Sequence, residues 1–93
     1  AICPFVSHRE RELREFAANF QAIIFVGGKH SSNTKVLFNT IKEVNPNSYH
    51  IEHPDELPLE KLSDAESIGV SGSASTPMWQ LKEVEDVIRK KLG

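Results

Sequence analysis

A short apolar run that ends at two glycines constrains this chain more than any other feature. Residues 22–26 read Ala-Ile-Ile-Phe-Val, with no polar residue among them. An unbroken run of this length is typical of a strand covered on both faces, as in a parallel sheet. Gly27 and Gly28 follow, and they predict a sharp turn at positive φ that also admits a ligand close to the main chain. We therefore expect a buried strand with a ligand-accessible turn at its carboxyl end.

Three polar residues follow the glycine pair and lead into a helical pattern. Ser31, Ser32 and Asn33 offer two hydroxyls and an amide beside the unpaired N–H groups of a helix N-terminus, which is a favourable arrangement for an anion. In the alternative interpretation, Ser32 or Asn33 merely caps the helix. Capping needs one polar side chain and three stand here in a row, so a phosphate-type site is favoured. Lys29 is expected to be solvated, as a lysine beside a loop usually is.

Three segments have helical periodicity with one apolar stripe each. The first follows a capping box of Ser7 and Glu10 and begins at about residue 8. The second ends at Asn-Pro-Asn, residues 45–47, and the third begins at Thr76-Pro77, with the threonine as N-cap. The stripes consist of Leu13, Phe16, Ala17 and Phe20; of Val36, Leu37, Ile41 and Val44; and of Leu81, Val84, Val87, Ile88 and Leu92.

Strands are expected at 22–26, 48–52 and 68–71, with a short helical turn near Pro58 in the connection 55–62. Alternating strands and helices imply parallel pairing through right-handed crossovers. The most apolar strand should be central. The sequence therefore predicts an α/β fold, a three-layer domain with a small parallel sheet of strand order 2-1-3 and helices on both faces. Between strands one and three the winding direction reverses, and open α/β sheets bind ligands at that point.

The two serine-bearing turns border this crevice. Residues 72–77 read Gly-Ser-Ala-Ser-Thr-Pro, and Ser75 is expected to face Ser31, Ser32 and Asn33 across it. Hydrogen bonds to a charged acceptor contribute about 1.5 to 3 kcal/mol each, and each helix end adds about 0.3 to 1 kcal/mol. After the cost of ordering a ligand, such a site would bind a small phosphorylated compound in the micromolar to millimolar range.

Composition and charge exclude several other functions. The 93 residues are enough for one compact core, and no apolar run is long enough to cross a membrane. A net charge of -2 without a basic stripe argues against nucleic acid as a partner. The single cysteine, Cys3, excludes an intrachain disulfide and fits a reducing, cytoplasmic compartment. The chain starts at Ala1 rather than methionine, which we interpret as the removal of an upstream part.

Other conspicuous side chains are expected to have structural or solvent-exposed roles. His50 and His53 are three residues apart along a predicted strand and would point to opposite faces, so they cannot readily share a metal. They are expected at the surface, as is His30. Met78 and Trp79 are expected to pack in the first turn of the last helix, although they could also wall the crevice.

Two motifs carry a resemblance to a known family. Gly-Lys-His-Ser-Ser-Asn-Thr at 28–34, together with Gly-Val-Ser-Gly-Ser-Ala-Ser-Thr-Pro at 69–77, resembles the C-terminal lobe of the 4-hydroxy-3-methylbut-2-enyl diphosphate reductases, the LytB or penicillin tolerance family. The resemblance covers essentially the whole chain. It implies that residues 1–93 form a single α/β lobe, the C-terminal third of a three-lobed oxidoreductase of isoprenoid biosynthesis. In that family a [4Fe-4S] cluster, held by one cysteine per lobe, removes the substrate's hydroxyl to give isopentenyl and dimethylallyl diphosphate.

The resemblance also implies residue roles and partners. Cys3 would be the third cluster ligand, and Ser31, Ser32, Asn33 and Ser75 would hold the substrate's diphosphate. The proton-donating glutamate lies in another lobe, so no catalytic residue is expected in this one. The implied partners are the two other lobes and a ferredoxin- or flavodoxin-type electron donor. One thiolate cannot hold a cluster, so the isolated lobe is expected to bind none and to be inactive.

A second hypothesis from a different class stays open. Residues 4–7 read Pro-Phe-Val-Ser, where the family usually has Ala-Thr and a polar run, so the cluster chemistry could have been lost. The chain would then be a stand-alone phospho-ligand binding or regulatory module that kept the crevice. The two hypotheses differ in what lies upstream of Ala1: further cluster cysteines and the acid glutamate, or a start codon.

Overall fold

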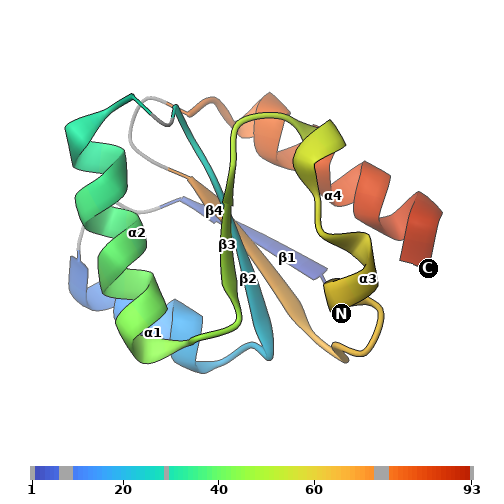
Figure 1. Ribbon diagram of the computed structural model, residues 1–93, viewed down its shortest axis with the longest axis horizontal. Coiled ribbons are helices and arrows are strands. Elements are labelled where there is room, and N and C mark those ends of the chain that lie inside the picture. Colours follow the sequence, from blue (N-terminus) through green and yellow to red (C-terminus); the bar gives the residue numbers. More distant parts are fainter. Residues whose placement is uncertain (1, 7–9, 29, 73–75, 93) are drawn as a thin grey trace.

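The chain forms one parallel sheet between two layers of helices (Figure 1). The computed structural model describes residues 2–6, 10–28, 30–72 and 76–92, with residues 2–6 and 92 described by their backbone alone. In chain order the elements are β1 (Ile2–Val6), α1 (Glu10–Ala18), β2 (Ala22–Val26), α2 (Ser32–Val44), β3 (Ser48–Ile51), the 3₁₀ turn η1 (Pro54–Glu56), α3 (Leu59–Leu62), β4 (Ile68–Gly72) and α4 (Met78–Leu92).

The four strands follow the order β1-β4-β2-β3, and every neighbouring pair is parallel. The three strands that the sequence predicts are β2, β3 and β4, and their order 2-1-3 is confirmed. The edge strand β1 was not predicted. Pro4 stands in its middle and argues against a strand, but an edge strand tolerates proline because one side of its backbone has no ladder partner. The β1 strand therefore extends the predicted sheet beyond β4.

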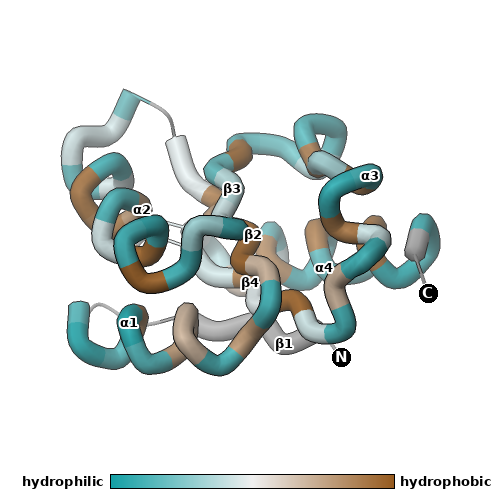
Figure 2. Tube along the Cα trace, turned by 60° about the horizontal axis from the view of Figure 1, so that its bottom comes forward, coloured by the Kyte–Doolittle hydropathy of each residue, from teal (hydrophilic) through white to brown (hydrophobic). Residues whose placement is uncertain are grey.

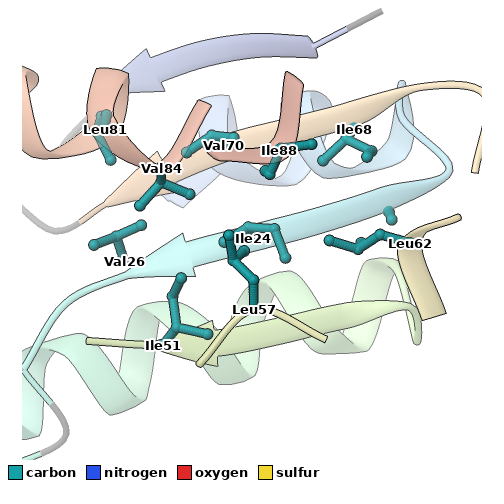
Figure 3. Close-up of a cluster of buried hydrophobic side chains, with 11 residues drawn as sticks. Ile24, Val26, Ile51, Leu57, Leu62, Ile68, Val70, Leu81, Val84 and Ile88 are labelled. Carbon is teal, nitrogen blue, oxygen red and sulfur yellow. The ribbon is translucent and has the colours of Figure 1, made fainter. Parts of the chain in front are cut away.

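The central strand β2 divides its side chains between two apolar layers, as predicted. Ile23 and Phe25 join the cluster under α1 and α2, whereas Ala22, Ile24 and Val26 join the cluster under α3 and α4. Figure 3 shows the second cluster between the sheet and α4. Hydrophilic and hydrophobic residues alternate along the helices, as expected when each helix buries one stripe (Figure 2). The three-layer arrangement with helices on both faces is confirmed.

The apolar stripes are confirmed with one exception. Leu13, Ile41 and the three inward residues Leu81, Val84 and Ile88 are fully buried. Val36 was predicted in the stripe of α2 but is 61% exposed, because the inward face of that helix runs from Thr34 through Leu37 to Ile41. The Ser7 half of the predicted capping box and the side chain of Leu92 lie outside the described residues. Within the described ranges, every helix is too short or too polar to cross a lipid bilayer.

Asn45 ends α2 and joins it to α1. Its buried side-chain amide donates to the carbonyls of Ala17 at 3.0 Å and Phe20 at 2.8 Å, and its Oδ1 accepts the Asn47 N–H at 3.0 Å. The predicted stop at residues 45–47 is confirmed, and Asn45 has a wider role than turn formation. Asn45 therefore joins the end of α2 to the end of α1 and the residues that follow it.

Candidate anion-binding site

The carboxyl ends of β2 and β4 lie side by side at one edge of the sheet. Val26 and Gly72, the last residues of the two strands, are partners in the parallel register. The Thr76 hydroxyl, beyond the end of β4, donates a buried hydrogen bond of 2.9 Å to the Val26 carbonyl. Thr76, four residues after the end of β4, therefore lies against the end of β2, and the two strand ends are neighbours as the predicted strand order requires.

Gly72 makes this close approach possible. A Cβ at this position would lie 2.9 Å from Cβ and Cγ2 of Thr76 and 3.0 Å from the Val26 carbonyl oxygen. Contacts this short to a β-branched side chain and to a backbone atom cannot be relieved by moving a flexible side chain. A glycine at the end of β4 is thus what allows Thr76 to reach Val26.

The Gly27–Gly28 turn differs from its prediction. No glycine among the described residues has positive φ, so the expected left-handed turn is wrong. At Gly27 the ladder with β3 continues past β2, because its N–H donates to the Ile51 carbonyl at 3.0 Å. Apart from its chain neighbours, a Cβ at Gly28 would meet no atom within 4 Å. Gly28 is therefore required neither by backbone strain nor by packing, and the space beside its Cα is open.

The N-terminus of α2 carries the three predicted polar residues. Ser31 is the N-cap, and its hydroxyl accepts the Thr34 N–H at 3.3 Å. The alternative that Ser32 or Asn33 caps the helix is wrong, because these are its first two helical residues and both are exposed. The first N–H groups of a helix have no partner within it. Two exposed polar side chains and these N–H groups thus stand together at the carboxyl edge of the sheet.

The predicted residues of the second turn are only partly placed. Ser75 and, in the first turn, Lys29 lie outside the described residues. Thr76 was predicted as the N-cap of the last helix, but α4 begins at Met78 and the Thr76 hydroxyl donates to Val26. A threonine before Pro77 predicts a cap from local sequence, and no local signal indicates a partner fifty residues away.

Several side chains near this edge also differ from expectation. Met78 and Trp79 are 46% and 66% exposed, so the prediction that they pack is wrong. They belong to the first turn of α4, and the first fully buried residue of this helix is Leu81. His30 and His53 are exposed, as predicted, but His50 is partly buried and its ring nitrogen lies 3.0 Å from the Gly27 carbonyl.

No set of residues in the described part of the chain can hold a metal by itself. The described residues contain no group of three or more His, Cys, Asp or Glu in position to bind a metal ion. Cys3 lies in β1, where it pairs with Gly69 of β4, three residues before the carboxyl end of the strand. It is the only cysteine of the chain, whereas an iron–sulfur cluster takes three or four thiolates. This chain alone therefore does not fit such a cluster.

Comparison with known proteins places the chain in a family. The sequence model of the LytB protein family matches residues 1–89. The 4-hydroxy-3-methylbut-2-enyl diphosphate reductase of Bacteroides fragilis is 45% identical over 91 residues, which make up 98% of this chain and 31% of that protein. The relative from Aquifex aeolicus, of the same name, is 38% identical over 96% of this chain and 31% of its own length.

A solved structure agrees with the sequence comparison. The structure of (E)-4-hydroxy-3-methyl-but-2-enyl diphosphate reductase, the terminal enzyme of the non-mevalonate pathway, matches with a TM-score of 0.83 and 38% identity. The match covers 88% of this chain and 29% of that one. The chain spans about 30% of the length of the curated relatives it matches. It belongs to the LytB protein family.

Proposed function

We propose that this chain is the C-terminal lobe of a three-lobed iron–sulfur 4-hydroxy-3-methylbut-2-enyl diphosphate reductase. In this proposal it supplies most of the diphosphate grip and one cluster cysteine. The observation that carries the proposal is the Thr76–Val26 hydrogen bond, because it places Thr76, four residues after β4, against the end of β2 at the carboxyl edge of the sheet. The names of the relatives support a diphosphate as the bound anion.

Ser31, Ser32, Asn33 and Ser75 are the proposed diphosphate ligands. Ser32 and Asn33 are exposed in the first turn of α2 and can turn their polar groups toward an anion. Ser31 already accepts the Thr34 N–H, but its own hydroxyl hydrogen is available to a phosphate oxygen. Ser75 lies in sequence just before Thr76, which the structure fixes beside Val26. Backbone N–H groups of α2 would complete the site.

Cys3 is the proposed cluster ligand of this lobe, and two further cysteines would come from the other lobes. When bound, the cluster would supply the electrons for removal of the substrate's hydroxyl. This lobe contributes no catalytic residue to that reaction in our proposal. Its own residues bind and orient the diphosphate, so the isolated lobe is inactive. A ferredoxin- or flavodoxin-type donor and a reducing, cytoplasmic location complete the proposal for the whole reductase.

A stand-alone phospho-ligand binding module is the second candidate. One observation favours it. The elements beside the anion site, β2, β4 and α2, pack into the two apolar clusters of this chain and need no other lobe. An iron–sulfur cluster, in contrast, would need cysteines from other lobes. The coding sequence upstream of Ala1 separates the two candidates. Two further cysteines and the acid glutamate support the reductase, and a start codon supports the module.

Replacing Gly28 with alanine tests the anion site without disturbing the fold. Apart from its chain neighbours, the added methyl group would meet no atom within 4 Å, and the site needs no positive φ, so we expect unfolding to be unchanged or up to about 1 kcal/mol less favourable. Pyrophosphate affinity is expected to fall about tenfold, because the methyl group occupies the space beside the main chain that the anion would use. Calorimetric titration and thermal unfolding measure the two effects. An unchanged affinity would contradict an anion bound at this turn.

A further inference from the structure

The side chain of His50 reaches from β3 to the turn that follows β2. Its Nε2 lies 3.0 Å from the carbonyl oxygen of Gly27. A carbonyl oxygen only accepts, so Nε2 must carry the hydrogen of this bond, which fixes the tautomer of the neutral ring. The sequence alone predicted a surface histidine. The structure instead shows a partly buried ring with a defined partner at the beginning of the candidate anion turn.

Aromatic neighbours fix the orientation of the His50 ring. Phe25 is its register partner on β2, and the two ring centroids are 5.9 Å apart with the planes at 66°. The Phe38 ring from α2 lies 5.3 Å away with an interplanar angle of 34°. A ring held on two sides loses little further freedom when it donates a hydrogen bond. The His50 donor is therefore preorganised toward Gly27.

Both backbone polar groups of Gly27 are hydrogen-bonded to β3. Its N–H donates to the Ile51 carbonyl at 3.0 Å, and its own carbonyl accepts the His50 hydrogen. The next residue is also hydrogen-bonded, since the Gly28 carbonyl accepts the Ser31 N–H at 3.2 Å. Ser31 in turn caps α2. Two hydrogen bonds, His50 to Gly27 and Ser31 to Gly28, thus connect β3 through the turn to the N-cap of the helix that presents Ser32 and Asn33.

We propose that His50 is a positioning residue of the anion site. By holding the Gly27 carbonyl, it sets the path of the turn and so the place at which the first turn of α2 meets the bound anion. This inference rests on the proposed diphosphate site, and His50 itself touches no ligand in it. In the competing interpretation, His50 only fills space between Phe25 and Phe38, and any ring of similar size would serve equally well.

Three substitutions separate these interpretations. His50→Phe keeps a ring between Phe25 and Phe38 but removes the donor, and His50→Gln keeps a side-chain N–H that can reach the carbonyl. Phe38→Leu is the matched control, because it removes a ring contact of His50 and leaves the Gly27 bond. The measurements are pyrophosphate affinity, the backbone amide signals of Gly27, Gly28 and Ser31, and the ring ¹⁵N shifts of His50 in its neutral form.

We expect the ring ¹⁵N shifts to show hydrogen on Nε2. His50→Phe should move the Gly28 and Ser31 amide signals and weaken pyrophosphate binding about three- to tenfold, the loss of one hydrogen bond. His50→Gln should recover most of the affinity. Phe38→Leu keeps the Phe25 contact and the Gly27 hydrogen bond, so it should lower the affinity less than His50→Phe, even where it lowers thermal stability. If His50→Phe does not fold, the glutamine variant and the wild-type tautomer decide the question.

Two outcomes would overturn the proposal, and they are distinguishable. If the wild-type chain binds pyrophosphate and His50→Phe binds it equally well with the Gly28 and Ser31 signals unmoved, His50 only fills space and the anion site stands. Hydrogen on Nδ1 rather than Nε2 would have the same meaning. If the wild-type chain shows no pyrophosphate binding, the anion site itself fails, and with it both the proposed function and the role given to His50.

Discussion

Replacing Ser32 and Asn33 together with alanine is expected to abolish measurable pyrophosphate binding and to leave the stability of the chain almost unchanged. Both side chains are exposed, so the free energy of unfolding should change by no more than about 0.5 kcal/mol. Each loses a hydrogen bond to a charged acceptor, and two such bonds contribute at least about 3 kcal/mol, or roughly a hundredfold in affinity. Calorimetric titration and urea unfolding would measure the two quantities on the same preparation.

Ser31→Ala is the matched control for this experiment. Ser31 caps α2 through the Thr34 N–H, so its removal should lower the free energy of unfolding by about 1 kcal/mol and also weaken binding. Ser31 therefore stabilises the helix, whereas Ser32 and Asn33 do not cap it. If the Ser32 and Asn33 double variant lost stability but kept its affinity for pyrophosphate, these side chains would serve the helix rather than an anion.

Replacing Cys3 with serine in the full-length protein, which we propose to be an iron–sulfur reductase, is expected to remove the iron–sulfur absorption band after anaerobic reconstitution. Turnover should fall by at least about a hundredfold, since even the partners that orient a metal ligand contribute ten- to a hundredfold. Serine is close to cysteine in size, and Cys3 lies in the edge strand β1, so the backbone pairing with Gly69 should survive. Absorption spectroscopy and a reductase assay would measure the band and the turnover.

The Ser32 and Asn33 double variant of the same full-length protein should change the other quantity, the affinity for the diphosphate. It should keep the absorption band and lose affinity for the diphosphate, whereas Cys3→Ser should lose the band and keep affinity for pyrophosphate. A full band in the Cys3→Ser protein would remove this residue from the cluster. The crossed design therefore tests the two proposed contributions of the lobe independently.

The fold could largely be predicted because its main signals are local. The buried run at 22–26 and the apolar stripes of the helices follow from periodicity, and the order of β2, β3 and β4 follows from which strand is the most apolar. Strand β1 could not be predicted in the same way. Its residues include Pro4, and they form a strand by pairing with β4, which is more than sixty residues away in sequence.

The candidate site could be predicted in outline but not in its internal contacts. Polar residues after a glycine pair indicated the N-terminus of α2, although the cap is Ser31 and the glycines have no positive φ. The two contacts that shape the turns were missed. Thr76 donates to Val26 across fifty residues and His50 to Gly27 across twenty-three, and local sequence patterns carry no signal for partners so distant.

The central claim is that the turns after β2 and β4 bind the same anion. A titration of the chain with pyrophosphate, followed through backbone amide signals, tests it most directly. We expect Gly28, Ser32 and Asn33 in one turn, and Gly72 and Thr76 in the other, to shift together with one dissociation constant. A response confined to one turn, or two different dissociation constants, would contradict a shared site.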